Sequence, residues 1–134
     1  MNRIPLYRIA AVVVSVAMYA GVAHAATAEG AGADCAAATR QGDMNACAAQ
    51  AYARSDASLN RSYGELMQKL PAGRKAGLRE VQRAWLRYRD LHCGFAAAGY
   101  AGGSMQPMVK SNCLAAVTET RAGLLRELLE EASR

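Results

Sequence analysis

Apolar residues recur at steps of three or four along three stretches of the chain, the spacing of one face of an α-helix. The first stretch begins near Asp43, a predicted N-cap, and ends before Pro71, which disfavours helical geometry at the residue before it. We therefore expect a first helix over residues 43–70. Its inward face comprises Met44, Ala48, Ala51, Tyr52, Ser55, Leu59, Tyr63, Leu66 and Leu70.

The second stretch covers residues 74–98, with Gly99 as its expected end. It carries one apolar stripe, expected to face the core, and one basic stripe. The apolar stripe comprises Leu78, Val81, Trp85, Tyr88, His92 and Phe95; the basic stripe comprises Arg79, Arg83 and Arg87.

A turn-rich loop over residues 99–106 leads to Pro107, which suits the first turn of a third helix. The apolar residues assigned to that helix are Cys113, Ala116, Val117, Thr120, Leu124 and Leu128. No strand pattern and no internal repeat occur in the sequence. The pattern predicts an all-α domain, a small three-helix up-down-up bundle with its apolar stripes inward.

The first 25 residues read as a secretory signal: Arg3 and Arg8 form a basic start, residues 9–22 an apolar run, and Ala25 ends a small-x-small site. The apolar run is shorter than the ~20 residues that span a bilayer. We expect cleavage after Ala25 and a periplasmic or secreted product with no stable membrane anchor.

The remaining chain divides into two parts. Residues 26–42 are rich in small residues and predict a flexible N-terminal arm, and residues 43–134 form the helical domain. The net charge is +5 for the whole chain, and loss of Arg3 and Arg8 leaves +3. This mild basicity lacks the strong basic patch of nucleic-acid-binding proteins, so we expect no nucleic-acid partner.

Four cysteines follow the signal. In a small exported domain this even number predicts disulfides, which proximity pairs as Cys35 with Cys47 and Cys93 with Cys113. Each bridge closes a short loop and contributes ~3 kcal/mol in the chain-entropy model. No C-x-x-C pair occurs, and His92 is the single histidine after the signal, so we expect no metal and no cofactor.

Several segments resemble the LprI-like family, long catalogued as a domain of unknown function and named after a mycobacterial lipoprotein reported as a lysozyme inhibitor. They are Met44-Asn45-Ala46-Cys47, residues 56–60 with Tyr63, residues 82–93 (QRAWLRYRDLHC), Gly102-Gly103-Ser104, and Cys113-Leu114 with Thr118 and Arg121. The resemblance covers nearly the whole mature chain. It implies an exported, non-enzymatic protein that binds another protein.

The residues of this family pattern suit structural roles: Asp56, Asn60, Tyr63, Gln82, Trp85, Arg89, Asp90 and Arg121. Trp85 is expected to anchor the core, with ligand stacking as the alternative. Arg89 and Asp90 form a charge pair able to reach Asp56 or Glu119 on neighbouring helices.

Two surfaces are candidates for partner binding. The first is the arginine ridge, defined as Arg79, Arg83 and Arg87, whose like charges favour an acidic partner unless Glu80 and Asp90 offset them in a solvated face. The second is the glycine loop, with Tyr100, Gly102, Gly103 and Ser104. It suits insertion into a cleft, and a simple flexible turn is the alternative.

Two functions fit these surfaces: inhibition of lysozyme or another cell-wall hydrolase by occlusion of its cleft, or a structural, accessory or immunity-like module that binds a periplasmic protein. Animal lysozymes are strongly cationic, so a chain at +3 is repelled by them, which favours a less basic target. An enzyme is not expected. The cysteines are bridged, His92 is expected to pack on an apolar face, and Glu127, Glu130 and Glu131 belong to a solvated helix end.

Overall fold

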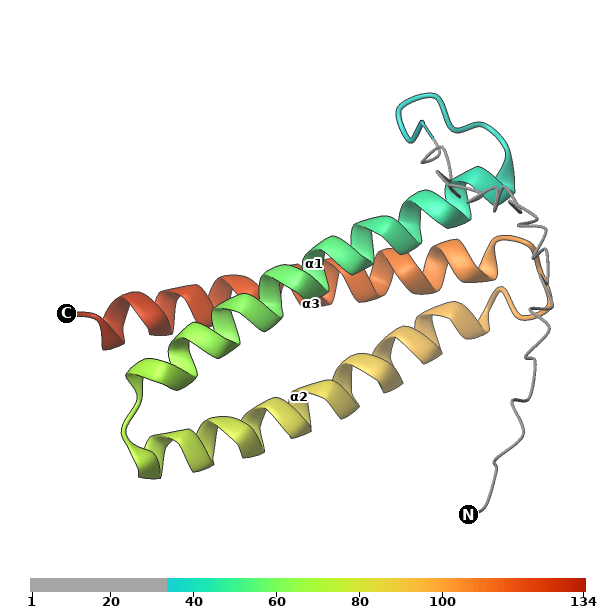
Figure 1. The fold of residues 1–134 in the computed structure, drawn as a ribbon. Coiled ribbons are helices and arrows are strands. Elements are labelled where there is room, and N and C mark those ends of the chain that lie inside the picture. The colour runs from blue at the N-terminus through green and yellow to red at the C-terminus, as the bar shows by residue number, and fades with distance from the viewer. Residues whose placement is uncertain (1–33) are drawn as a thin grey trace, which may run out of the picture. The chain divides into compact units, whose positions relative to one another are not determined.

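The computed structural model describes residues 34–134, and the expected signal peptide and residues 26–33 of the arm lie outside that part. It contains three helices, α1 (Gln41–Lys69), α2 (Ala72–Ala98) and α3 (Gln106–Ala132). Figure 1 shows α1 and α3 running in one direction. Helix α2 runs in the opposite direction, from the end of α1 to the start of α3. The described chain has no strand, so the predicted all-α, up-down-up bundle is confirmed.

The helix ends follow local sequence signals, with one exception. Pro71 separates α1 from α2, Gly99 caps α2, and Pro107 stands in the first turn of α3, all as predicted. The exception is Asp43, because α1 begins at Gln41 and Arg40 occupies the N-cap position. Asp43 instead lies in the first turn, where its carboxylate accepts a hydrogen bond of 2.8 Å from Arg40 Nε. This contact raises the pKa of Arg40.

The main core lies near the turn between α1 and α2. Its central residues come from all three helices, with α3 packed closely against α1 and less extensively against α2. They are Leu59, Leu66, Leu70, Leu78, Ala122 and Leu125. We call this half of the bundle the leucine end. The residues predicted to face inward from α1 are all buried or half-buried, which confirms that stripe.

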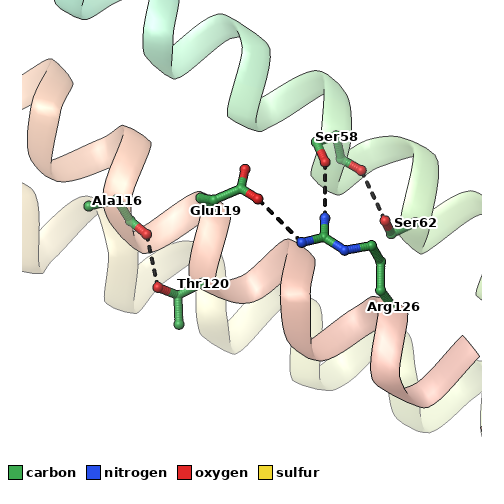
Figure 2. Close-up of polar contacts among 6 residues, drawn as sticks. All are labelled: Ser58, Ser62, Ala116, Glu119, Thr120 and Arg126. Carbon is green, nitrogen blue, oxygen red and sulfur yellow. Dashed lines mark hydrogen bonds and ion pairs between the residues drawn. The ribbon is translucent and has the colours of Figure 1, made fainter.

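Polar side chains also link α1 to α3, as Figure 2 shows. The Arg126 guanidinium donates to Ser58 Oγ at 3.2 Å and forms an ion pair with Glu119 at 3.3 Å. Ser58 in turn accepts a hydrogen bond from Ser62 Oγ through its main-chain carbonyl. These side chains fix the contact between the two parallel helices at about its midpoint.

The inward stripe predicted for α2 is partly wrong. Val81, Tyr88, His92 and Phe95 are exposed, and Phe95 retains 84% of its accessible surface. The buried positions of α2 are Leu78, Gln82, Cys93 and Ala97, with Trp85 half-buried as predicted. The actual inner face is rotated because two polar residues on it, Gln82 and Arg89, find partners on the neighbouring helices.

The prediction for α3 is also corrected. Thr118, Ala122 and Leu125 are its buried residues, whereas Ala116, Thr120 and Leu124, all predicted to face inward, are exposed. The reason is that α3 packs mainly against α1, and the positions predicted to be buried lie beside the face that makes this contact.

Both predicted disulfides are present, which confirms the pairing. Cys35 bonds to Cys47 with a Cα–Cα distance of 5.6 Å, and Cys93 bonds to Cys113 with a distance of 5.5 Å. The first bridge ties the segment before α1 to its second turn, and the second joins the end of α2 to the start of α3. Both therefore lie at the end of the bundle opposite the leucine end.

Candidate functional site

The end of the bundle that carries both disulfides is the candidate site, and we call it the tip. It comprises residues 91–109, which cover the end of α2, the glycine loop and the first turn of α3, together with the start of α1. A side-chain contact joins these parts, because Asn45 Nδ2 of α1 donates to the main-chain oxygen of Ser104 at 3.1 Å. Crosslinks and hydrogen bonds thus hold the glycine loop against two helices.

The loop has its own hydrogen-bonded frame. The main-chain amide of Gly103 donates to the carbonyl of Tyr100 at 3.0 Å, and that of Gln106 donates to Gly103 at 3.2 Å. The Gln106 side chain accepts from the amide of Gly102 at 3.3 Å. Tyr100 and Ala101 also donate to the last carbonyls of α2. These hydrogen bonds define the backbone shape of the loop.

Two glycines in the loop are required by this shape. Gly102 has a φ of +78°, in the left-handed region that L side chains rarely adopt. At Gly103 an added Cβ would stand 3.2 Å from the carbonyl oxygen of Tyr100, tighter than an ordinary contact. Gly102 thus permits the left-handed backbone conformation, and Gly103 permits the close approach to the Tyr100 carbonyl.

Residues 91–109 of the tip expose large apolar side chains and carry no formal charge. Leu91 and Phe95 are 75% and 84% exposed, and Tyr100 and Met105 are also exposed. No Asp, Glu, Lys or Arg occurs in residues 91–109. Phe95 was predicted to lie in the core, whereas Leu91 and Met105 were not predicted to belong to any site. The long uncharged run around them was the signal that could have identified this surface.

The amides that lead into α3 are available to a ligand. The N–H groups of Ser104 and Met105 donate to no acceptor in the described part of the chain, and both residues are exposed. They lie at the amino end of a 27-residue helix, whose dipole favours a negative group nearby. Residues 91–109 can thus attract a carboxylate through backbone amides, without a charged side chain in that segment.

The arginine ridge lies on the exposed side of α2 that faces α1. Arg79 and Arg83 line a recess between α1 and α2 with Asp56, Asn60 and Tyr63. Arg83 pairs with Glu80, as expected.

Arg87 has no ion pair among residues 34–134, because Asp90, its expected partner, binds Arg89 instead at 2.8 Å. Arg87 precedes Gly99 by 12 residues, or ~18 Å along the helix. The structure therefore does not bring the ridge and the glycine loop together into one site.

The residues of the family pattern form an internal polar network. Arg89 contacts Asp56 at 3.8 Å and lies over the rings of Tyr52 and Trp85, at 5.7 and 5.4 Å from their centroids. Glu119, the other predicted partner of Arg89, pairs with Arg126 instead. Asn60 Nδ2 donates to Asp56 at 2.8 Å. These contacts connect α1 to α2.

A second polar contact connects α2 to α3. Arg121 Nε donates to Gln82 Oε1 at 3.2 Å, while its Nη2 is buried without a hydrogen-bond partner. Burial lowers the pKa of Arg121. Both side chains act in helix packing, and Trp85 likewise packs against the core rather than standing free to stack on a ligand.

His92 lies at the edge of the tip and is exposed, which corrects the expectation that it packs on an apolar face. Its ring stacks on Tyr88 with the centroids 5.4 Å apart. Within residues 34–134, no three His, Cys, Asp or Glu side chains gather closely enough to hold a metal ion. No helix in this part is long and apolar enough to cross a bilayer.

Residues 33–125 match the model of a family described as lysozyme inhibitor LprI. An uncharacterized protein of Rhizobium meliloti (strain 1021) is 39% identical over 112 residues, which cover 74% of this chain and 81% of that protein. No solved structure matches. The extent of the family match, over both disulfides and the glycine loop, shows that the chain belongs to the LprI family.

Proposed function

We propose that this protein is exported to the periplasm or beyond and inhibits a cell-wall glycoside hydrolase by inserting the tip into its cleft. The observation that carries the proposal is the shape of the glycine loop. It is exposed, hydrogen-bonded into one backbone conformation, and held next to a disulfide. A loop that is already ordered loses little entropy on binding, which favours tight association.

The chemistry of the tip suits a glycosidase cleft. Such a cleft holds two carboxylates that act on the glycosidic bond. The free amides of Ser104 and Met105, at the positive end of the α3 dipole, offer hydrogen bonds to a carboxylate, and the Ser104 hydroxyl adds another donor. The exposed Tyr100 provides an apolar surface of the kind that packs against sugar-binding clefts.

The charge distribution of the protein indicates which kind of hydrolase it can bind. The tip is neutral, whereas α2 carries six basic and two acidic residues. A hydrolase that is less basic than animal lysozymes would meet the neutral tip without repulsion and be attracted by Arg87 beside it. We therefore propose a wall hydrolase with an acidic or neutral rim as the partner.

The experiment is a lysis assay in which a panel of purified wall hydrolases digests peptidoglycan with and without excess protein. Slowing of at least one enzyme is expected. Two variants that each lower the charge by one then locate the contact: Ser104→Glu brings a carboxylate against the catalytic carboxylates and should abolish inhibition, while Arg87→Gln should weaken it little. No slowing of any enzyme, or loss with Arg87→Gln alone, would reject cleft insertion.

Loss of inhibition with Arg87→Gln alone would favour the second candidate function, an accessory or immunity-like module that binds a periplasmic protein. The observation in its favour is that Arg87 is exposed with no ion pair in the described chain, so that the ridge has a cation free for an acidic partner.

A further inference from the structure

One face of α2 has the pattern of a helix-packing surface but packs against nothing within its own bundle. Its six residues follow one another at steps of three and four, and all six are exposed. They are Val81, Ala84, Tyr88, Leu91, Phe95 and Ala98, which we call the α2 seam. Regular alternation of three and four is the spacing by which two helices pack side by side.

The seam is distinct from the face by which α2 joins the bundle. That inner face holds Leu78, Gln82, Cys93 and Ala97, and the arginine ridge lies on the side toward α1. The seam spans 18 residues, or ~26 Å along the helix. Exposed apolar residues occur singly on most soluble proteins, whereas a continuous row of this length marks an interaction surface.

We propose that the seam binds a second copy of this chain, with the two α2 helices antiparallel about a two-fold axis between Arg89 and Asp90. In this register Ala84 opposes Phe95 of the second copy, Tyr88 opposes Leu91, and Val81 opposes Ala98. Every seam residue is then paired, and the two alanines face two larger residues. A two-fold axis repeats each contact, as in most homodimers.

Size matching selects the antiparallel arrangement. A parallel pair would place Ala84 against Ala84 and Phe95 against Phe95, leaving a gap at one level and crowding at another. Close packing without gaps is what stabilises one register over another.

Charge selects the same arrangement. The basic residues of α2 lie before residue 90, whereas residues 91–109 carry no charge. Antiparallel packing lays the basic half of one helix along the uncharged half of the other, while parallel packing would align the two basic halves. The charged residues that flank the seam are Glu80 and Arg87. In the proposed register Arg87 lies level with His92 of the second copy, in the half of α2 that carries no Asp, Glu, Lys or Arg.

The area is sufficient for a specific dimer. A fully covered aromatic side chain buries ~150–250 Å², so Tyr88 and Phe95 of two copies, 55% and 84% exposed, contribute roughly 500 Å² together. Leu91, Val81 and the alanines bring the total toward the ~1,000 Å² of a specific interface. The inference goes beyond the proposed function, since the glycine loop follows the seam and stays free at each end of the dimer.

The test uses the full exported chain with its disulfides intact. Sedimentation equilibrium over a range of concentrations should show a reversible dimer. Phe95→Ala should raise the dimer dissociation constant roughly tenfold or more, because aromatic anchors dominate interface affinity. Ala84→Phe should also disrupt the dimer, since the new ring meets Phe95 of the second copy.

The decisive variant combines both changes. Ala84→Phe with Phe95→Ala exchanges the large and the small residue at each of the two symmetry-related contacts between positions 84 and 95. The double variant should restore the wild-type dissociation constant to within a few fold. Ala76→Phe places the same ring on an exposed α2 position outside the seam and should leave the dimer unchanged. Circular dichroism checks that each variant is helical.

Three results would overturn the proposal: a wild-type chain that stays monomeric at millimolar concentration, a double variant no tighter than its weaker single variant, or equal disruption by Ala76→Phe. A seam that binds anionic vesicles or a different protein while the chain stays monomeric would likewise replace the second copy as its occupant.

Discussion

The two ends of the bundle are stabilised in different ways. At the leucine end, large apolar side chains from three helices are buried against one another. At the tip, the buried residues are small, such as Ala48, Cys93 and Ala97, while Leu91 and Phe95 face solvent. Two disulfides and the hydrogen bonds of the loop hold the tip together. At the tip, covalent links therefore replace apolar packing and leave the large side chains available for a partner.

The largest expected effect concerns two leucines in opposite environments. Leu125 at the leucine end is 0% exposed, and Leu91 at the tip is 75% exposed. Leu125→Ala should lower the free energy of unfolding by ~2–5 kcal/mol through lost burial and the cavity left behind. Leu91→Ala should change it by less than about 0.5 kcal/mol in dilute solution, where the chain is monomeric. Urea unfolding measures both, and equal costs would refute the contrast between the ends.

The second effect concerns the bridge between α2 and α3. Replacing Cys93 and Cys113 together by alanine should lower stability by ~3 kcal/mol, because the unfolded chain gains the freedom that the bridge removes. Amide hydrogen exchange should accelerate most at the end of α2 and the start of α3. If instead exchange accelerated equally at the leucine end and the tip, the bridge would stabilise the fold as a whole and not the tip.

A smaller effect distinguishes two glycines near the tip. Gly102→Ala forces a side chain into the left-handed region and should cost ~1 kcal/mol. Gly94 lies inside α2 with open space around it, so Gly94→Ala should stabilise the protein by ~0.5–1 kcal/mol. Thermal unfolding of the two variants should therefore shift in opposite directions. A stabilising Gly102→Ala would show that the loop does not hold its conformation in solution.

The smallest expected effect is on the α1–α3 contact of Figure 2. Removing the ion pair with Glu119→Gln should cost at most ~0.5 kcal/mol, since both side chains are about half exposed to solvent. A double-mutant cycle with Arg126→Met isolates the pair from other contacts. Because both partners lie on α3, a coupling energy above ~1 kcal/mol would mean that the ion pair stabilises α3 itself and does more than orient Arg126 toward Ser58 of α1.

Much of this fold could be predicted from the sequence. The proline and glycine positions defined the helix boundaries, and the cysteine spacing gave both bridges. The inward face of α1 was predicted correctly because one apolar stripe dominates the helix, although its N-cap was not. These signals are local, since each depends on neighbouring residues and not on what packs against them.

The inner face of α2 could not be found from hydrophobicity alone. Its true inner line includes Gln82 and Arg89, which are polar and become acceptable inside only through Arg121 and Asp56 on other helices. The exposed seam, by contrast, is more apolar and more regular. One signal was available: Cys93 must face α3 to form its bridge, and Gln82, Trp85 and Arg89 lie on its side of the helix.

Of the candidate contact surfaces, the glycine loop could be named from the sequence because its composition is unusual. Its rigidity could not, since the frame depends on Asn45 and on hydrogen bonds between backbone groups. The separation of the loop from the arginine ridge also depends on the fold. The ridge lies within α2 and the loop follows the end of α2, but the two occupy different parts of the surface.

The most direct test of the account is a hydrogen-exchange footprint of this protein bound to a wall hydrolase that it slows. Protection confined to residues 91–109 and the start of α1, with the leucine end unchanged, is the predicted result. Protection along the arginine ridge or at the turn between α1 and α2, with none at the glycine loop, would contradict the assignment of recognition to the tip.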